Sequence, residues 1–216
     1  MNVKYKLKEI AEDVYLCTIQ NSYDLAMTFC RVQEFYESPF EKIRGKKFTM
    51  LEFMRKYTLK NPDGVFSYPA EWAGFNIPGP TIEKMFALGI DDFNYYDNII
   101  YSIHNKINKK KYYLIASSGE DVSTTEHELC HAFYFLDSKY RKAANELVNN
   151  LPINIFNKIK KKLIGMGYCD KVIKDEIQAY LSTGHEDVLR IRISNKTLKE
   201  FKTLFGKYKH KKNVTI

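Results

Sequence analysis

The sequence lacks long apolar runs, closely spaced cysteines and a glycine-rich phosphate-binding loop. Its longest apolar runs cover only a few residues, whereas a transmembrane helix needs about 20. The four cysteines are scattered and form no CxxC pair, which argues against a zinc ribbon. The first fifteen residues are charged throughout and contain no apolar signal core. We therefore expect a soluble, cytoplasmic protein with no membrane partner and with free thiols at Cys17, Cys30, Cys130 and Cys169.

Positive charge is in excess, with a formal net charge of +8 over 216 residues. Much of the excess lies in lysine-rich runs at 106–111, 158–162 and 207–212. No motif that reads nucleic acid accompanies these runs, so we interpret them as solvated surface and expect at most weak nucleic-acid binding. The sequence does not indicate an oligomeric state.

The order of predicted helices and short strands indicates an α+β fold, mostly helical, with a small sheet. We expect a single domain over 1–208 and a basic tail at 209–216. Within it, residues 1–110 would form a substrate-side half and residues 111–208 a catalytic half. A proline-rich stretch at 61–80 is expected to be loop. Its residues Trp72, Phe75 and Asn76 either line a substrate cleft or, more simply, pack around a turn.

The second half contains four predicted elements that bear on chemistry. Residues 112–117 (YYLIAS) form a predicted strand, and residues 124–136 a helix with Ser123 and Glu126 spaced as a capping box. Another helix is predicted to begin at Asp170 and to end at Gly184. Alternating apolar residues at 188–193 indicate a further strand.

The helix at 124–136 carries the pattern HELCH, in which His127 and His131 lie four residues apart. That spacing places both imidazoles on one helix face, where both can bind one metal ion. Glu128 follows the first histidine and is placed to act as a general base toward a metal-activated water. Cys130 lies between the histidines at a helical angle that does not favour metal binding, so we expect a packed thiol.

HELCH followed by DEIQAY resembles the gluzincin branch of the zincin metallopeptidases over about residues 112–184. The resemblance implies a zincin-like fold, one zinc ion per chain and hydrolysis of a peptide or protein substrate. It also implies that Glu176, on the later helix, is the third zinc ligand. The substrate would lie extended beside residues 112–117 and pair with them as an added strand.

Other assignments remain open at this stage. Asp137 stands where the related metzincins carry their third ligand, and His185 is another candidate for that ligand. HELCHAF also resembles SprT-type proteases that act on DNA-bound proteins, although no third histidine follows closely. ImmA-type peptidases are similar as well. A different class is a non-catalytic zinc-containing binding protein with affinity for polyanions.

Three residues have possible supporting roles. Asp175 is either a hydrogen-bonding partner of a ligating histidine or a solvated acid. Tyr180 lies four residues after Glu176 and either packs or donates a hydrogen bond to an oxyanion. His185 is a second candidate for the oxyanion role.

Overall fold

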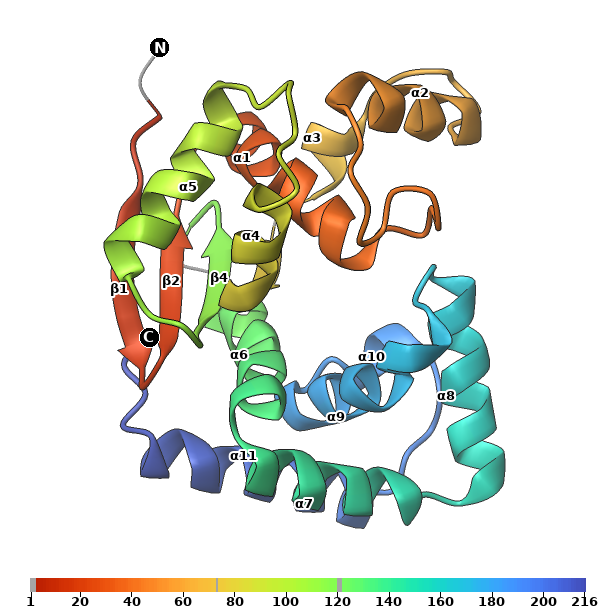
Figure 1. Ribbon diagram of the computed structural model, residues 1–216. Coiled ribbons are helices and arrows are strands. Elements are labelled where there is room, and N and C mark those ends of the chain that lie inside the picture. The colour runs from red at the N-terminus through yellow and green to blue at the C-terminus, as the bar shows by residue number, and fades with distance from the viewer. Residues whose placement is uncertain (1–2, 73, 120–121) are drawn as a thin grey trace. The chain divides into compact units, whose positions relative to one another are not determined.

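The computed structural model describes residues 3–72, 74–119 and 122–216 (Figure 1). The chain divides into two compact units, one formed by residues 1–9 and 13–120 and the other by residues 10–12 and 121–216. The division falls after residue 120, whereas the sequence places the limit between its two halves after residue 110. Among the described residues, helices predominate and one small sheet has four strands, so the fold is mixed α and β as expected.

The sheet has the strand order β1-β2-β4-β3. Its strands are β1 (Lys6–Ala11), β2 (Val14–Thr18), β3 (Gly74–Pro78) and β4 (Tyr113–Ser117). Strand β4 pairs in parallel with β2 and antiparallel with β3, in the registers Val14 to Tyr113 and Gly74 to Ser117. Both edges of β4 are therefore occupied. The prediction that a substrate pairs with this strand is wrong, because an added strand needs a free edge.

The helices of the first unit contact one another and the strand β3. They are α1 (Ser22–Glu37), α2 (Met50–Lys60), α3 (Tyr68–Glu71), α4 (Gly79–Phe86) and α5 (Tyr95–Ile107). Helix α1 is buried along most of its length and contacts α3, α4, α5 and β3. Its Arg31 is fully buried and donates hydrogen bonds to Asp92 and Asp97, which joins α1 to the start of α5. A buried charge persists only when it is paired in this way.

The stretch 61–80 is not only loop, because it contains α3 and β3. Its aromatic residues form a stack in which the Trp72 ring lies 5.4 Å from Tyr68 and 5.8 Å from Phe75. Phe75 is buried and Asn76 accepts a hydrogen bond from Tyr113 on β4 at 2.6 Å. The packing interpretation of these residues therefore holds for Phe75 and Asn76, which consolidate the sheet.

The second unit is built from helices around α9 (Figure 1). They are α6 (Val122–Leu136), α7 (Ser138–Asn149), α8 (Ile153–Gly165), a short 3-10 helix (Asp170–Val172), α9 (Ile173–Thr183), α10 (Glu186–Leu189) and α11 (Asn195–Lys211). Helix α9 contacts α6, α7, α8 and α11, and eight of its eleven residues are buried. It is the central helix of this unit.

Two local predictions for the second unit are wrong. Residues 188–193 form no strand: Leu189 ends α10 with its side chain buried, and Arg190 takes a left-handed φ of 53° that turns the chain. Ser123 lies within α6 and is not its N-cap, and the residue before the helix lies outside the described part. Helix α11 continues to Lys211, so the basic tail expected at 209–216 begins within this helix.

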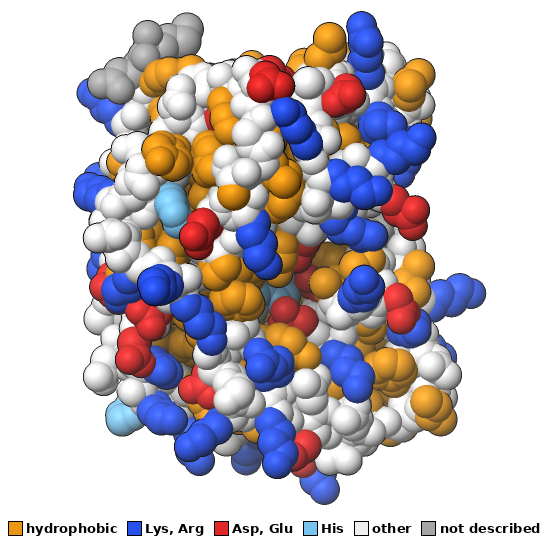
Figure 2. All heavy atoms as spheres, in the orientation of Figure 1, with side chains coloured by type: hydrophobic (Ala, Val, Ile, Leu, Met, Phe, Trp, Pro, Cys, Tyr) orange, Lys and Arg blue, Asp and Glu red, His pale blue; other side chains and the backbone are white. Residues whose placement is uncertain are grey.

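Among the residues that the structure describes, no helix is long and apolar enough to cross a membrane. Lysine and arginine side chains are dispersed over the face shown in Figure 2, with acidic side chains among them. All four cysteines are free thiols, as predicted.

Candidate metal centre

Helix α6 presents its two histidines on one side because its other side is held in the core of the second unit. Leu129, Ala132 and Phe133 are buried, and the Phe133 ring lies 5.7 Å from Tyr140 on α7 and 6.0 Å from Phe205 on α11. This apolar backing fixes the rotation of α6 about its axis. Cys130 is buried within the same backing, and burial raises the pKa of its thiol, so it is a packed residue as predicted.

Helix α9 brings Glu176 toward α6. The helix ends at Thr183 because Gly184 takes a left-handed φ of 83°, the conformation that glycine adopts without steric cost. Glu176 lies in the first turn of α9 and is only 7% exposed. A carboxylate this deeply buried requires cationic or hydrogen-bonding partners.

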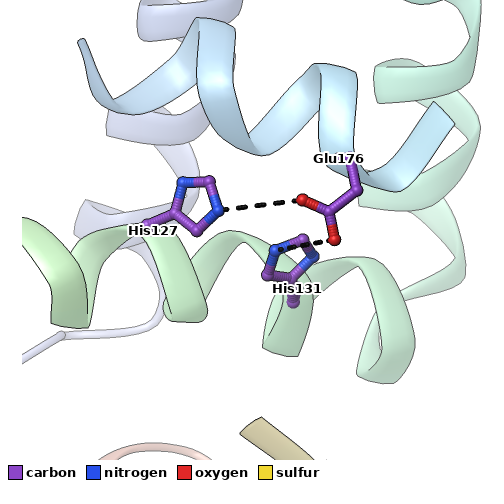
Figure 3. A group of neighbouring side chains, drawn as sticks. All are labelled: His127, His131 and Glu176. Atoms are coloured by element: carbon purple, nitrogen blue, oxygen red, sulfur yellow. Dashed lines mark ion pairs between the residues drawn. The ribbon is translucent and has the colours of Figure 1, made fainter. Parts of the chain in front are cut away.

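His127, His131 and Glu176 converge between the two helices (Figure 3). Glu176 directs one carboxylate oxygen toward each imidazole, with Oε2 lying 3.9 Å from Nε2 of His127 and Oε1 lying 3.8 Å from Nε2 of His131. One donor atom from each residue lies within 4.8 Å of the others. Zinc bonds of about 2.0–2.1 Å in tetrahedral geometry separate ligand atoms by about 3.4 Å, so the three side chains would have to move together by up to about 1.4 Å to bind one ion. This group could hold a metal ion.

The second nitrogen of His131 is fixed by a chain of hydrogen bonds that leads from partly buried Asp175 into the core. Its Nδ1 lies 2.9 Å from Oδ1 of Asp175, and Nε2 of Gln178 donates to the same Asp175 oxygen at 2.9 Å. Tyr140 then donates from its hydroxyl to Oε1 of Gln178 at 2.8 Å. Asp175 therefore orients the ring so that Nε2 faces Glu176, which is the arrangement typical of histidines that bind metal. Of its two predicted alternatives, the structure places Asp175 as the histidine partner.

The two imidazoles differ in protonation. Burial lowers the pKa of His127 to about 2, and the adjacent rings of His131 and His185 act in the same direction. His127 is therefore neutral, the form that binds metal. Burial also opposes a charge on His131, but Asp175 and Glu176 outweigh it and raise the pKa of this ring well above its ordinary value. A site that attracts a proton so strongly is a site where a cation is electrostatically favoured.

Glu128 lies beside His127 on α6 and is half-buried. Its carboxylate contributes to raising the pKa values of His131, Tyr168 and Tyr180, so its charge acts directly on this group of side chains. Glu128 therefore adds a second carboxylate to the centre that is not part of the candidate ligand set.

Tyr180 also lies at the centre, with its ring edge-on to His127 at 4.9 Å. Its hydroxyl lies 3.3 Å from the hydroxyl of Tyr168. Tyr168 is a residue of the centre that sequence reasoning missed. Tyr168 comes from the connection between α8 and the 3-10 helix, where no periodic pattern could place it. Burial raises the pKa of both phenols, so both keep their protons.

Two rival ligands have other roles. Asp137 accepts hydrogen bonds from the backbone of Lys139 and Tyr140 as the N-cap of α7, so it is committed to starting that helix. His185 lies near His127, but its Nε2 is 2.9 Å from the Ser123 hydroxyl and its Nδ1 is 2.8 Å from the Thr183 hydroxyl. Either a ligand role or an oxyanion role for His185 would require breaking one of these bonds.

Thr183 is a further residue of the centre that sequence reasoning missed. It lies seven residues after Glu176, which is two helical turns along the same face of α9. That spacing was visible in the sequence, and Tyr180 was found by the same logic. Gln178 was not recognisable, because its role depends on Tyr140 from another helix.

No protein-family model matches this sequence, and no curated protein or solved structure matches it either. The site must therefore be interpreted from its own chemistry. That chemistry is two imidazoles and one buried carboxylate converging from two helices, with a second carboxylate next to the first histidine.

Proposed function

We propose that this chain is a zinc-dependent metallopeptidase with a gluzincin-type site and a zincin-like fold. The observation that carries the proposal is the convergence of His127, His131 and Glu176, with Glu128 adjacent on the same helix. Two histidines and one glutamate are the ligand set of several catalytic zinc sites. Structural zinc sites usually have four protein ligands, whereas three are found here among the described residues.

When bound, a zinc ion polarises a substrate carbonyl and lowers the pKa of a water molecule toward roughly 7. The chain supplies the groups that move the proton. Glu128 accepts the proton of the attacking water and then delivers it to the leaving amine. Its position beside His127 brings it close to the metal site without making it a ligand. A purely structural zinc site would have no use for a base at this position.

The hydroxyls of Tyr168 and Tyr180 provide hydrogen-bond donors. They share one hydrogen bond, which uses one of their two protons and leaves the other available. We assign that proton to the oxygen of the tetrahedral intermediate, where the negative charge develops. Tyr180 is the better placed of the two, because its ring packs against His127.

The test is metal content measured together with peptide cleavage. The purified protein should contain one zinc ion per chain and cleave members of a peptide library. A chelator should abolish the cleavage and added zinc should restore it. His127→Ala should lose both metal and cleavage, whereas replacing an exposed histidine on α11, His210→Ala, should change neither. Absence of stoichiometric metal in protein purified under zinc-replete conditions would refute the proposal.

A further inference from the structure

Thr183 contacts two histidines through a single hydroxyl group. Its Oγ1 lies 2.8 Å from Nδ1 of His185 and 3.5 Å from Nδ1 of His127. The same oxygen lies 2.8 Å from the backbone carbonyl oxygen of Ala179, one turn earlier on α9. We propose that Thr183 is a positioning residue that fixes the tautomer and orientation of His127 for metal binding. The inference rests on the proposed function, because it assumes that His127 is a ligand.

The Thr183 hydroxyl donates its hydrogen to the carbonyl oxygen of Ala179. A carbonyl oxygen accepts hydrogen bonds and never donates them, so the contact with Ala179 uses the hydroxyl hydrogen. Threonine near a helix end commonly bonds in this way to the carbonyl four residues earlier. The oxygen of Thr183 is then left with its lone pairs only, and both histidine nitrogens that face it must donate.

His127 must therefore carry its hydrogen on Nδ1. The lone pair of Nε2 then faces Glu176, which is the direction from which a shared metal ion would be bound (Figure 3). The opposite tautomer would set the lone pair of Nδ1 against that of the Thr183 oxygen. Thr183 thus does for His127 what Asp175 does for His131, from the same helix.

The turn after α9 completes the arrangement. Gly184 takes a left-handed φ of 83° and turns the chain, so that His185 folds back on Thr183. His185 also carries its hydrogen on Nδ1 by the same argument, which leaves its Nε2 to accept from the Ser123 hydroxyl on α6. The contacts of His185 with Ser123 and Thr183 connect α6 to the end of α9 beside the candidate ligand.

The expected effect is smaller for Thr183 than for Asp175. The contact between Thr183 and His127 is 3.5 Å and neutral, whereas that between Asp175 and His131 is 2.9 Å and carries a charge. Removing a partner of a ligating histidine typically weakens metal binding by about 10–100-fold. We therefore expect about tenfold for loss of the Thr183 hydroxyl.

The first experiment measures the affinity of the full chain for Co²⁺, by competition with a chelator and by the visible absorption of bound cobalt. Thr183→Val keeps the shape of the side chain but removes the hydroxyl, and it should weaken binding about tenfold. Thr183→Ser keeps the hydroxyl, so its affinity should stay within about threefold of wild type. That change is smaller than the one expected for Thr183→Val. Thr203→Val, at an exposed position on α11, is the matched control and should have no effect.

The second experiment needs no variant. Nuclear magnetic resonance of the metal-free protein with 15N-labelled histidine reports which ring nitrogen carries the hydrogen. His127 should carry it on Nδ1, and a hydrogen on Nε2 would overturn the inference even if Thr183→Val failed to fold. Equal cobalt affinity of wild type and Thr183→Val would also overturn it, while leaving the metal site intact. Failure of the wild-type protein to bind cobalt at all would overturn the proposed function as well.

Discussion

Asp175 offers the most quantitative test of the metal centre. Its Oδ1 accepts from Nδ1 of His131 and from Nε2 of Gln178, so this acid contacts a candidate ligand directly. Asp175→Ala removes the acceptor and leaves the Nδ1 hydrogen of a buried ring without its partner. Asp175→Asn keeps an oxygen in the same place, with two lone pairs for the same two donors, and removes only the charge.

The magnitude follows from the geometry. A hydrogen bond to a charged group contributes about 1.5–3 kcal/mol. The bond here is short, and His131 is buried with 5% of its side chain exposed, but the Asp175 side chain is 25% exposed and is partly screened by water. A value of about 2 kcal/mol for Asp175→Ala corresponds to about 30-fold weaker zinc binding. Asp175→Asn should lose about half of that free energy, or about fivefold in affinity.

The assay is zinc competition against a fluorescent chelator, with unfolding by urea as a check on folding. Asp187→Asn, at an exposed site on α10, is the control and should bind zinc as the wild type does. The expected order of affinity is wild type, then Asp175→Asn, then Asp175→Ala. Zinc affinity unchanged in Asp175→Ala would refute the assignment of His131 as a ligand oriented by this carboxylate.

Three other predictions concern the third ligand, the first unit and the surface charge. Glu176→Ala should abolish stoichiometric zinc binding, measured by atomic absorption, and metal retained at one ion per chain would exclude Glu176 as a ligand. Burial raises the pKa of Glu34 on α1 to about 7, so the folded chain binds this proton more tightly than the unfolded chain. Its contribution to stability is fully present below the unfolded pKa of about 4.5 and is lost as the pH rises through about 7, by up to about 3 kcal/mol. Urea unfolding at several pH values should show that loss in wild type and in Glu41→Gln but not in Glu34→Gln, and an identical pH profile in all three would contradict it. Binding to heparin or duplex DNA should be weak and should vanish between 50 and 200 mM salt, and tight, sequence-dependent binding at physiological salt would contradict our interpretation of the lysine runs.

Periodic patterns in the sequence located the elements of the site well. The HELCH spacing and the apolar stripe on the other face of the same segment predicted α6, and Gly184 marked the end of α9. Glu176 was expected from the resemblance to the gluzincins, and Tyr180 from its position four residues later on the same helix face. The helix predictions succeed because helix geometry relates residues three, four and seven apart without any knowledge of the tertiary fold.

Features that depend on distant pairing could not be predicted in the same way. Strand β3 lies in a proline-rich stretch and is a strand because β4 pairs with it, and that pairing also closes the edge expected to receive substrate. The alternation at 188–193 resembled a strand, but no strand pairs with this segment among the described residues. Asp137 resembled a possible ligand until the structure placed it as the cap of α7.

The measurement that tests the central claim most directly compares wild type with Glu128→Gln. The change keeps the size of the side chain and removes the base, so zinc content should remain at one ion per chain. Peptide hydrolysis should fall by a factor of about 10² or more, the scale expected when a general base is lost. Glu126→Gln, one residue before His127 on α6, is the control and should keep the wild-type rate. Cleavage by zinc-loaded Glu128→Gln at the full wild-type rate would contradict the account.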